Sequence, residues 1–89
     1  MLGWTVYIVE GERGALYTGI TTSVARRWAE HSGLRGRGAR FFRTQSPRDL
    51  VYVEVAADRG GALRREAEIK RFARTRKLAL IAAQRALAP

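Results

Sequence analysis

The chain has 89 residues, of which 46% are hydrophobic and 28% are charged, so we expect one folded α+β domain over residues 1–89 rather than a disordered chain. It contains no cysteine, which excludes disulfides, thiolate metal ligands and a cysteine nucleophile. No run approaches the ~18 consecutive apolar residues of a membrane span, and the start of the chain lacks the basic segment of a signal peptide. These features predict a soluble, cytoplasmic protein without a membrane partner.

The charge balance points to a polyanionic partner. Seventeen Lys and Arg residues oppose eight Asp and Glu residues, for a net charge of +9. Fifteen of the seventeen are arginine, the residue better suited to bidentate phosphate contacts. An arginine-rich proteome would explain the choice of arginine over lysine but not the scarcity of acidic residues. Nucleic acid is therefore the favoured partner.

The first elements in chain order form a predicted β-hairpin. Residues 4–9, WTVYIV, are β-branched and aromatic and predict a buried strand, and residues 15–20, ALYTGI, predict a second one. The glycine-containing segment 10–14 between them is short enough for a hairpin turn.

The hairpin register can be estimated from this loop. If Val9 pairs with Ala15, then Tyr7 falls opposite Tyr17. Both tyrosines project from the same face of the hairpin, because side chains on a strand alternate with period two.

A helix follows the hairpin and is capped by Thr21, Thr22 or Ser23. We expect it to continue to about Ser32, before Gly33. Its core face carries Val24 and Trp28, which are one turn apart. Arg27 and His31 are also one turn apart and lie at the edge of that face, where side chains can line a cleft between helix and sheet.

The remaining elements complete an α+β arrangement. The basic, glycine-rich segment 34–43 allows one helical turn near its end, and residues 49–57 predict a third strand. Helices are predicted over 61–74 and 77–88, the last serving packing or a dimer contact. The predicted fold is a small three-stranded antiparallel sheet flanked by helices. Its core contains two tryptophans and three valines: Trp4, Trp28, Val51, Val53 and Val55.

Glu66 is the sharpest anomaly in the predicted helices. At 100° per residue, Ala62, Ile69 and Ala73 lie within about 60° of it, so a carboxylate occupies the apolar stripe. Such a group is costly to bury unless it is paired or bound to a metal. A buried pair with an arginine and a metal-binding or catalytic role both remain open from position alone.

Glu68 lies on the opposite face of the same helix. Arg64 and Arg71 stand at i−4 and i+3 from it as partners. We expect an ordinary solvated ion pair there.

Four segments together resemble the GIY-YIG nuclease family. Thr5-Val6-Tyr7 and Tyr17-Thr18-Gly19 look like the two halves of its motif, and Arg26-Arg27-Trp28-Ala29-Glu30-His31 resembles its arginine-containing helix. Ala62-Leu63-Arg64-Arg65-Glu66 is similar to its glutamate helix. The resemblance spans roughly residues 4–81 and is closest to small stand-alone bacterial proteins. It implies a β-β-α-(α)-β-α-α order of elements.

The resemblance also implies a mechanism, divalent-metal-dependent hydrolysis of phosphodiester bonds. Glu66 would ligate a single Mg²⁺ or Mn²⁺ ion, and Arg27 would stabilise the extra negative charge of the transition state. Tyr17, or else Tyr7, would position or deprotonate the attacking water, with its pKa lowered by Arg27 and the metal. His31 would orient the water or share proton transfer.

The predicted substrate contacts surround these groups. Gly19 would let the backbone approach the phosphate closely. The segment 34–43 can clamp a nucleic-acid backbone and stack Phe41 and Phe42 on unpaired bases, or its two phenylalanines can simply anchor a solvated loop to the core. The predicted substrate-binding residues are Gly19, Arg26, Arg35, Arg37, Arg40 and Arg43.

The chain departs from the family pattern at three points. The first motif lacks its glycine, Ile20 stands where several members have a lysine or arginine, and the chain contains no asparagine although many members have one after the glutamate helix. These departures bear on catalytic efficiency more than on the fold.

We therefore expect an endonuclease-type domain that acts on DNA by structure rather than sequence, in DNA repair, recombination or processing. The alternative is a nucleic-acid-binding or partner-recruiting module with weak or no catalysis. RNA is a third possibility, less favoured than DNA. We expect a monomer or a weak homodimer.

Overall fold

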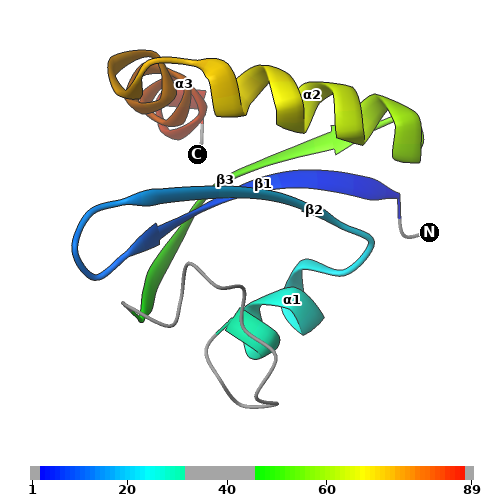
Figure 1. Cartoon of the computed structure of the whole chain (residues 1–89), viewed down its shortest axis with the longest axis horizontal. Helices are drawn as coiled ribbons and strands as arrows, with labels where there is room; N and C mark the ends of the chain where they lie inside the picture. The colour runs from blue at the N-terminus through cyan, green and yellow to red at the C-terminus, as the bar shows by residue number, and fades with distance from the viewer. Residues whose placement is uncertain (1–2, 32–45, 88–89) are drawn as a thin grey trace.

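The structure is a computed structural model, which describes residues 3–31 and 46–87. The described residues form an α+β fold with one three-stranded sheet and three helices, as the sequence predicts (Figure 1). In chain order the elements are β1 (Trp4–Gly11), β2 (Leu16–Thr21), α1 (Val24–His31), β3 (Pro47–Ala56), α2 (Arg59–Arg71) and α3 (Arg74–Leu87). None of the helices in this part of the chain is both long and apolar enough to cross a membrane.

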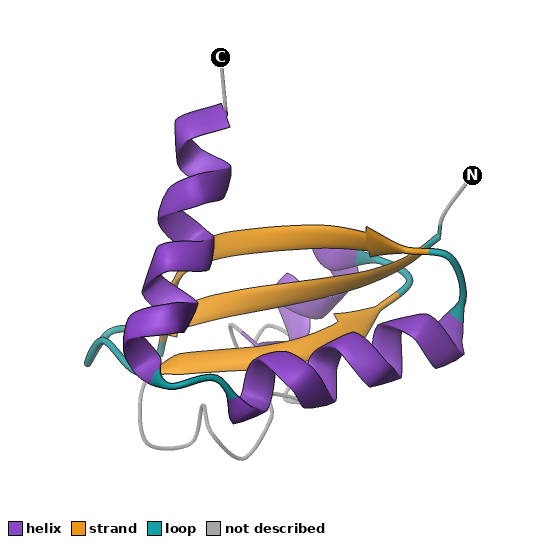
Figure 2. Cartoon of the chain, turned by 90° about the horizontal axis from the view of Figure 1, so that it is seen from above, coloured by secondary structure: helices purple, strands orange, loops and turns teal. Residues whose placement is uncertain are grey.

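The sheet is antiparallel with β1 in the centre and the order β2-β1-β3. After β3 the chain crosses to the opposite edge, and α2 runs back alongside β2 while α3 crosses the end of the sheet (Figure 2). Helix α1 lies on one face of the sheet, and α2 and α3 lie on the other (Figure 1).

The predicted hairpin register is wrong by two residues. Val9 pairs with Tyr17, and Tyr7 pairs with Gly19 rather than with Tyr17. The turn is tighter than expected: the Gly11 N–H donates to the Ala15 carbonyl at 2.8 Å. Only three residues lie between these two, and the last, Gly14, has φ +86°, which glycine adopts without strain. Because the error is an even number of residues, both tyrosines still share one face.

The hydrophobic core lies on the other face of the sheet, under α2 and α3. Val6 and Ile8 of the central strand are fully buried there, as are Ala62 and Ile69 of α2. Helix α1 covers part of the tyrosine face. The buried core cluster comprises Val6, Ile8, Val51, Tyr52, Ala62, Ile69 and Ile81.

The prediction that Val53 and Val55 belong to the core is wrong. Val53 and Val55 are 39% and 78% exposed, because they lie on the α1 face of an edge strand. Val51 is buried, and a register irregularity between Ile8 and Val9 in the pairing of β1 with β3 accompanies its turn towards the core. Trp4 and Trp28 are half-buried, and Trp4 packs against the core.

The helix boundaries differ from the predicted ones because of local caps. The Asp58 side chain accepts a hydrogen bond from the Gly61 N–H at 2.7 Å, so α2 starts two residues earlier than predicted. Phe72 adopts an extended conformation and ends α2 at Arg71. A new helix begins at Arg74, where the prediction still had the first one.

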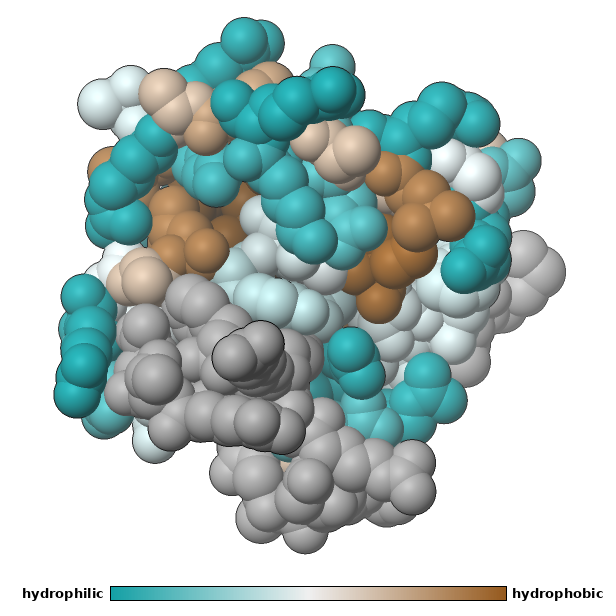
Figure 3. Space-filling view, viewed as in Figure 1, coloured by the Kyte–Doolittle hydropathy of each residue, from teal (hydrophilic) through white to brown (hydrophobic). Residues whose placement is uncertain are grey.

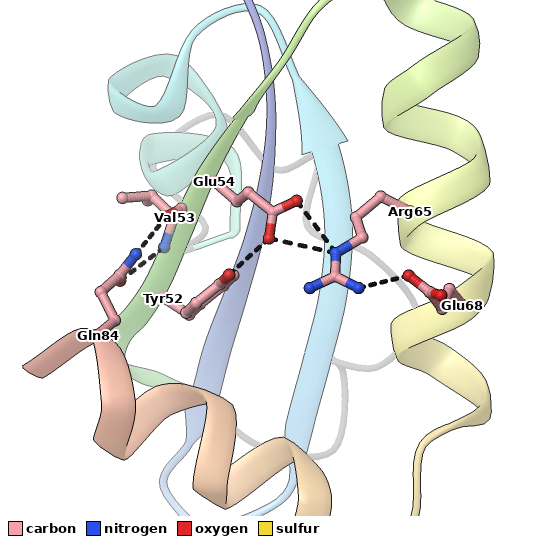
Figure 4. Close-up of polar contacts among 6 residues, drawn as sticks. All are labelled: Tyr52, Val53, Glu54, Arg65, Glu68 and Gln84. Atoms are coloured by element: carbon pink, nitrogen blue, oxygen red, sulfur yellow. Dashed lines mark hydrogen bonds and ion pairs between the residues drawn. The ribbon is translucent and has the colours of Figure 1, made fainter.

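Arg65 fastens α2 to the edge strand β3 (Figure 4). Its Nε donates to both carboxylate oxygens of Glu54, at 3.0 and 3.2 Å, and Glu54 also accepts from the Tyr52 hydroxyl at 2.6 Å. Arg65 pairs through a second nitrogen with Glu68. The pairing fixes the rotation of α2 about its own axis relative to the sheet.

Glu68 forms the exposed ion pair that the sequence predicts, but with another partner. It pairs with Arg65, three residues earlier, instead of Arg64 or Arg71. Arg65 is already held in place by Glu54, so its position costs little additional side-chain entropy.

Candidate active site

Helix α1 places Arg27 next to the tyrosine face of the sheet. Its start is fixed by Ser23, whose Oγ accepts from the Arg26 N–H at 3.3 Å, and by Thr21, whose Oγ1 accepts from the Ser23 N–H at 3.0 Å. Of the three predicted caps, Ser23 therefore makes the capping bond. The helix and sheet enclose a small recess lined by Tyr7, Val9, Val24, Arg27, Trp28 and Leu50.

Tyr7 is the most enclosed polar side chain of this face. It is 2% exposed, and its hydroxyl is hydrogen-bonded to Arg27. Its ring lies against Gly19 of β2, where an added Cβ would stand 2.5 Å from the hydroxyl oxygen. Gly19 thus makes room for the ring of Tyr7, a role that the sequence did not suggest.

Arg27 is held from two sides, and its Nε is unpaired among the described residues. Its NH1 donates to Glu30 Oε1 at 2.8 Å, and its side chain also contacts the Tyr7 hydroxyl. These two partners raise the pKa of Arg27, so it stays cationic. Its Nε is buried and has no hydrogen-bond partner among the described residues. A buried donor of this kind is costly unless a ligand satisfies it.

Tyr17 lies beside Tyr7 but is more accessible. The ring centroids are 6.3 Å apart with an angle of 43° between the planes, a contact typical of neighbouring aromatic side chains. Tyr17 is half-buried, whereas Tyr7 is buried.

The pKa of Tyr7 moves in the opposite direction to the one expected for a water-activating tyrosine. Burial raises the pKa of Tyr7 to about 12, and the charge of Glu66 and the proximity of Tyr17 act in the same direction. The hydrogen bond from Arg27 lowers it, as predicted, but burial is the larger effect. Tyr7 is therefore protonated at neutral pH.

Glu66 reaches this group of residues from α2. Its side chain is 18% exposed, and its nearest cation is Lys70, whose Nζ lies 3.2 Å from Oε2. It is thus paired with a lysine one turn away, and no arginine among the described residues forms an ion pair with it. Glu66 lies close enough to Tyr7 for its charge to act on the tyrosine hydroxyl.

The helical stripe explains how Glu66 comes to this place. Ala62 and Ile69 are fully buried, while Ala73 is exposed because α2 has already ended. With Ala62 and Ile69 facing the sheet, Arg65 lies about 60° to one side of the stripe and Glu66 about 40° to the other. Arg65 bonds to Glu54 on the core face, and Glu66 is left on the side of Tyr7.

The structure therefore brings together most of the predicted catalytic residues. Tyr7, Tyr17 and Arg27 lie together, Gly19 lies against the ring of Tyr7, and the charge of Glu66 acts on Tyr7. Arg26 is exposed next to Arg27. His31 is the last residue of α1, and its side chain lies outside the described part. The predicted binding residues of the segment 34–43 also lie outside it: Arg35, Arg37, Arg40 and Arg43.

Sequence reasoning missed Glu30 as a member of this site. The signal that could have found it is its i,i+3 spacing from Arg27 on a short helix. Its side chain is only 15% exposed, and it is the acceptor that orients the guanidinium.

The carboxylate content of the site limits how a metal can be held. Among residues 3–31 and 46–87, no group of three or more His, Cys, Asp or Glu side chains could hold a metal ion. Of the two site carboxylates in the described part of the chain, Glu30 is bonded to Arg27 and Glu66 is the one whose charge acts on Tyr7. A hard divalent cation bound through one carboxylate keeps several water ligands and takes further oxygens from a phosphate.

This fold and this convergence define a domain of the GIY-YIG type. Residues 3–79 match the GIY-YIG catalytic domain, and the chain belongs to that family. More particularly, it belongs with the small bacterial UPF0213 proteins. It is 49% identical over 80 residues to a UPF0213 protein of Desulfotalea psychrophila, covering 90% of this chain and 72% of the relative. It is 46% identical over 76 residues to one of Staphylococcus haemolyticus, covering 85% and 90%.

A solved structure supports the same assignment. The solution NMR structure of a UPF0213 protein from Bacillus halodurans superposes with a TM-score of 0.57 at 36% sequence identity. The match covers 90% of this chain and 83% of that one.

Proposed function

We propose that this protein hydrolyses phosphodiester bonds in DNA with the help of a single divalent metal ion, selecting its substrate by structure rather than by sequence. Repair, recombination or processing of branched or nicked DNA is the matching role. One arrangement carries the proposal: Arg27 is bonded to Glu30 and Tyr7, Tyr17 lies against Tyr7, and the charge of Glu66 acts on the same tyrosine.

Arg27 is the residue that binds the scissile phosphate. Glu30 and Tyr7 hold its guanidinium in place, and its side chain is 35% exposed, so its accessible N–H groups are preorganised for a phosphate oxygen. A donor fixed in place before the reaction stabilises developing negative charge without reorganisation at the moment of reaction.

Glu66 supplies the carboxylate for Mg²⁺ or Mn²⁺. When bound, such an ion polarises the phosphate and stabilises the leaving oxygen. Glu66 fits this role because it is mostly buried, offers carboxylate oxygens and, within residues 3–31 and 46–87, pairs only with the exposed Lys70. The lysine can swing into solvent because its side chain is 53% exposed.

The two tyrosines take different roles. Tyr7, with a pKa raised to about 12, keeps its proton and acts as a hydrogen-bonding support for Arg27. Tyr17 is the more accessible of the two and is the residue that positions the attacking water. His31 at the end of the same helix as Arg27 shares the proton transfer.

A binding module with weak or no catalysis is the second candidate. The observation that favours it is the ion pair of Glu66 with Lys70, which already satisfies the carboxylate. The absence of asparagine, which removes one side chain found in many family members, points the same way.

A substrate panel separates these functions. Branched, nicked, duplex and single-stranded DNA and the matching RNAs are incubated with the purified protein in Mg²⁺, in Mn²⁺ and in EDTA. We expect metal-dependent cleavage of a branched or nicked DNA and none in EDTA. Binding without cleavage on every substrate and with both metals would establish the binding module instead.

A further inference from the structure

Most of the net positive charge of this protein lies in the segment that forms α2 and α3. Residues 59–87, which form α2 and α3, contain nine basic and only two acidic residues. Hydrophilic side chains gather over these two helices along the upper rim of the molecule (Figure 3).

Several of these cations have no acidic partner. Among the described residues, the ion pairs of α2 and α3 join Arg65 to two glutamates, Lys70 to Glu66 and Arg85 to Asp49. Arg64, Arg71 and Arg76 form no ion pair among the described residues, and all three are exposed.

The unpaired arginines line two surface grooves that share Arg65. One surface groove is lined by Gly61, Arg64, Arg65, Ala67, Glu68 and Arg71. A second groove shares Arg65 and continues over Phe72, Arg76, Ala79 and Leu80 into the angle between α2 and α3. Arg76 stacks on the Phe72 ring with its guanidinium carbon 4.1 Å from the ring centroid, which fixes this cation in place.

The two arginines of α2, Arg64 and Arg71, face away from Glu66. At 100° per residue, Arg64 and Arg71 lie about 160° or more from Ala62, on the side of α2 opposite the sheet. They are seven residues apart, or about 10 Å along the helix. A rigid helix therefore presents two guanidinium groups to separate phosphates of a nucleic-acid backbone, while Glu66 stands on the other side of the same helix.

We propose that the arginine groove, formed by Arg64, Arg71 and Arg76, is a second nucleic-acid-binding surface that holds phosphodiester backbone away from the scissile phosphate. Its ligand is the phosphate backbone itself, because arginines without base-reading side chains around them recognise charge and not sequence. The inference shares the nucleic-acid partner of the proposed function but does not require catalysis. Two separated backbone contacts would favour DNA with more than one arm.

The test compares two double variants that remove the same charge. Arg64→Gln/Arg71→Gln removes two cations of the groove, and Arg48→Gln/Arg85→Gln removes two exposed cations that are paired with Glu10 and Asp49. Binding of a labelled four-way DNA junction is measured by fluorescence anisotropy in EDTA between 50 and 200 mM salt. Circular dichroism checks that both variants fold.

The expected result is a change in the salt dependence of the groove variant only. Loss of two phosphate contacts makes the negative slope of log K, the logarithm of the binding constant, against log salt shallower by about 1.8. Between 50 and 200 mM salt, the wild-type protein therefore loses roughly tenfold more affinity than the variant. The control variant keeps nearly the wild-type slope. Equal slopes in both variants, or no change in either, would overturn the inference.

The outcome is independent of whether the protein cleaves DNA. Cleavage with an unchanged salt slope in the groove variant would leave the proposed function standing and remove the second surface. A shallower salt slope in that variant, together with no cleavage by the wild type, would support the second surface and remove the proposed nuclease function.

Discussion

The ring of Tyr7 lies against the Cα of Gly19 on the neighbouring strand, at a distance that leaves no space for a side chain. A Cβ at position 19 would stand 2.5 Å from the hydroxyl oxygen of Tyr7 and 2.7 Å from Cζ. Both residues belong to the two halves of the family motif, and the contact lets the tyrosine hydroxyl reach Arg27. The glycine of the second half thus serves the tyrosine of the first.

Replacing Gly19 by alanine should displace Tyr7. The backbone at Gly19 is not in the left-handed region, so alanine is strained only by its contact with the ring. We expect Gly19→Ala to lower the free energy of unfolding by about 1–3 kcal/mol, measured by urea denaturation. In a Tyr7→Leu background the same change should cost much less, because the clashing atoms are gone. An equal cost in both backgrounds would show that the ring is not the cause.

The raised pKa of Tyr7 predicts a loss of stability at high pH. Ionisation is easier in the unfolded chain, near pH 10, than in the folded protein, where the pKa is about 12. The stabilising contribution is therefore fully present below pH 10 and is lost as the pH rises towards 12, by at most about 2–3 kcal/mol. Urea unfolding at pH 9 and pH 11 should show a steeper loss for the wild type than for Tyr7→Phe. Parallel losses would contradict the assignment.

Local patterns were sufficient to predict the elements and their order. The β-branched run of β1, the cap of α1 and the apolar stripe of α2 each depend on neighbours in sequence. The register of the hairpin was missed because a three-residue turn around Gly14 replaced the expected five-residue one. The exposure of Val55 was missed because an edge position depends on which strand takes the centre.

The candidate site was predicted in its residues but not in its electrostatics. Glu66 was found from its place in an apolar stripe, and that place follows from helical geometry alone. The pKa of Tyr7 depends on how completely β2 and α1 bury it, which no local pattern records. The partners of Arg65 and Glu66 depended on how far α2 is rotated against the sheet.

Gln84 protects the edge of the sheet beside β3. Its side-chain amide donates to the carbonyl of Val53 and accepts from the Val53 N–H, so it occupies the place of a neighbouring strand (Figure 4). Gln84→Ala should lower the free energy of unfolding by about 1 kcal/mol and increase self-association, because an open edge is available for pairing. Gln84→Glu keeps the acceptor for the Val53 N–H but loses the donor to the Val53 carbonyl, so it should lower the free energy of unfolding as Gln84→Ala does. Sedimentation at increasing protein concentration measures the association, and an unchanged profile would contradict this role.

Glu30 is predicted to act as a positioning residue for Arg27. Glu30→Ala removes the acceptor at 2.8 Å and frees the guanidinium to move. Single-turnover cleavage should slow by roughly 10- to 100-fold, while DNA affinity in EDTA stays within about twofold. Glu30→Gln retains an oxygen acceptor and should restore part of the rate. Equal defects in both variants, or a loss confined to affinity, would argue against positioning.

The measurement that tests the central claim most directly compares two glutamates of α2. Glu66→Gln removes the carboxylate beside Tyr7, and Glu68→Gln removes the exposed carboxylate on the other side of the helix. Cleavage is measured with Mg²⁺ or Mn²⁺ on the substrate identified by the DNA panel. We predict that Glu66→Gln lowers the cleavage rate by roughly 10³-fold, whereas Glu68→Gln cleaves at nearly the wild-type rate. Both variants should bind the substrate with nearly wild-type affinity. Cleavage that survives in Glu66→Gln, or is lost equally in Glu68→Gln, would contradict the assignment of this site.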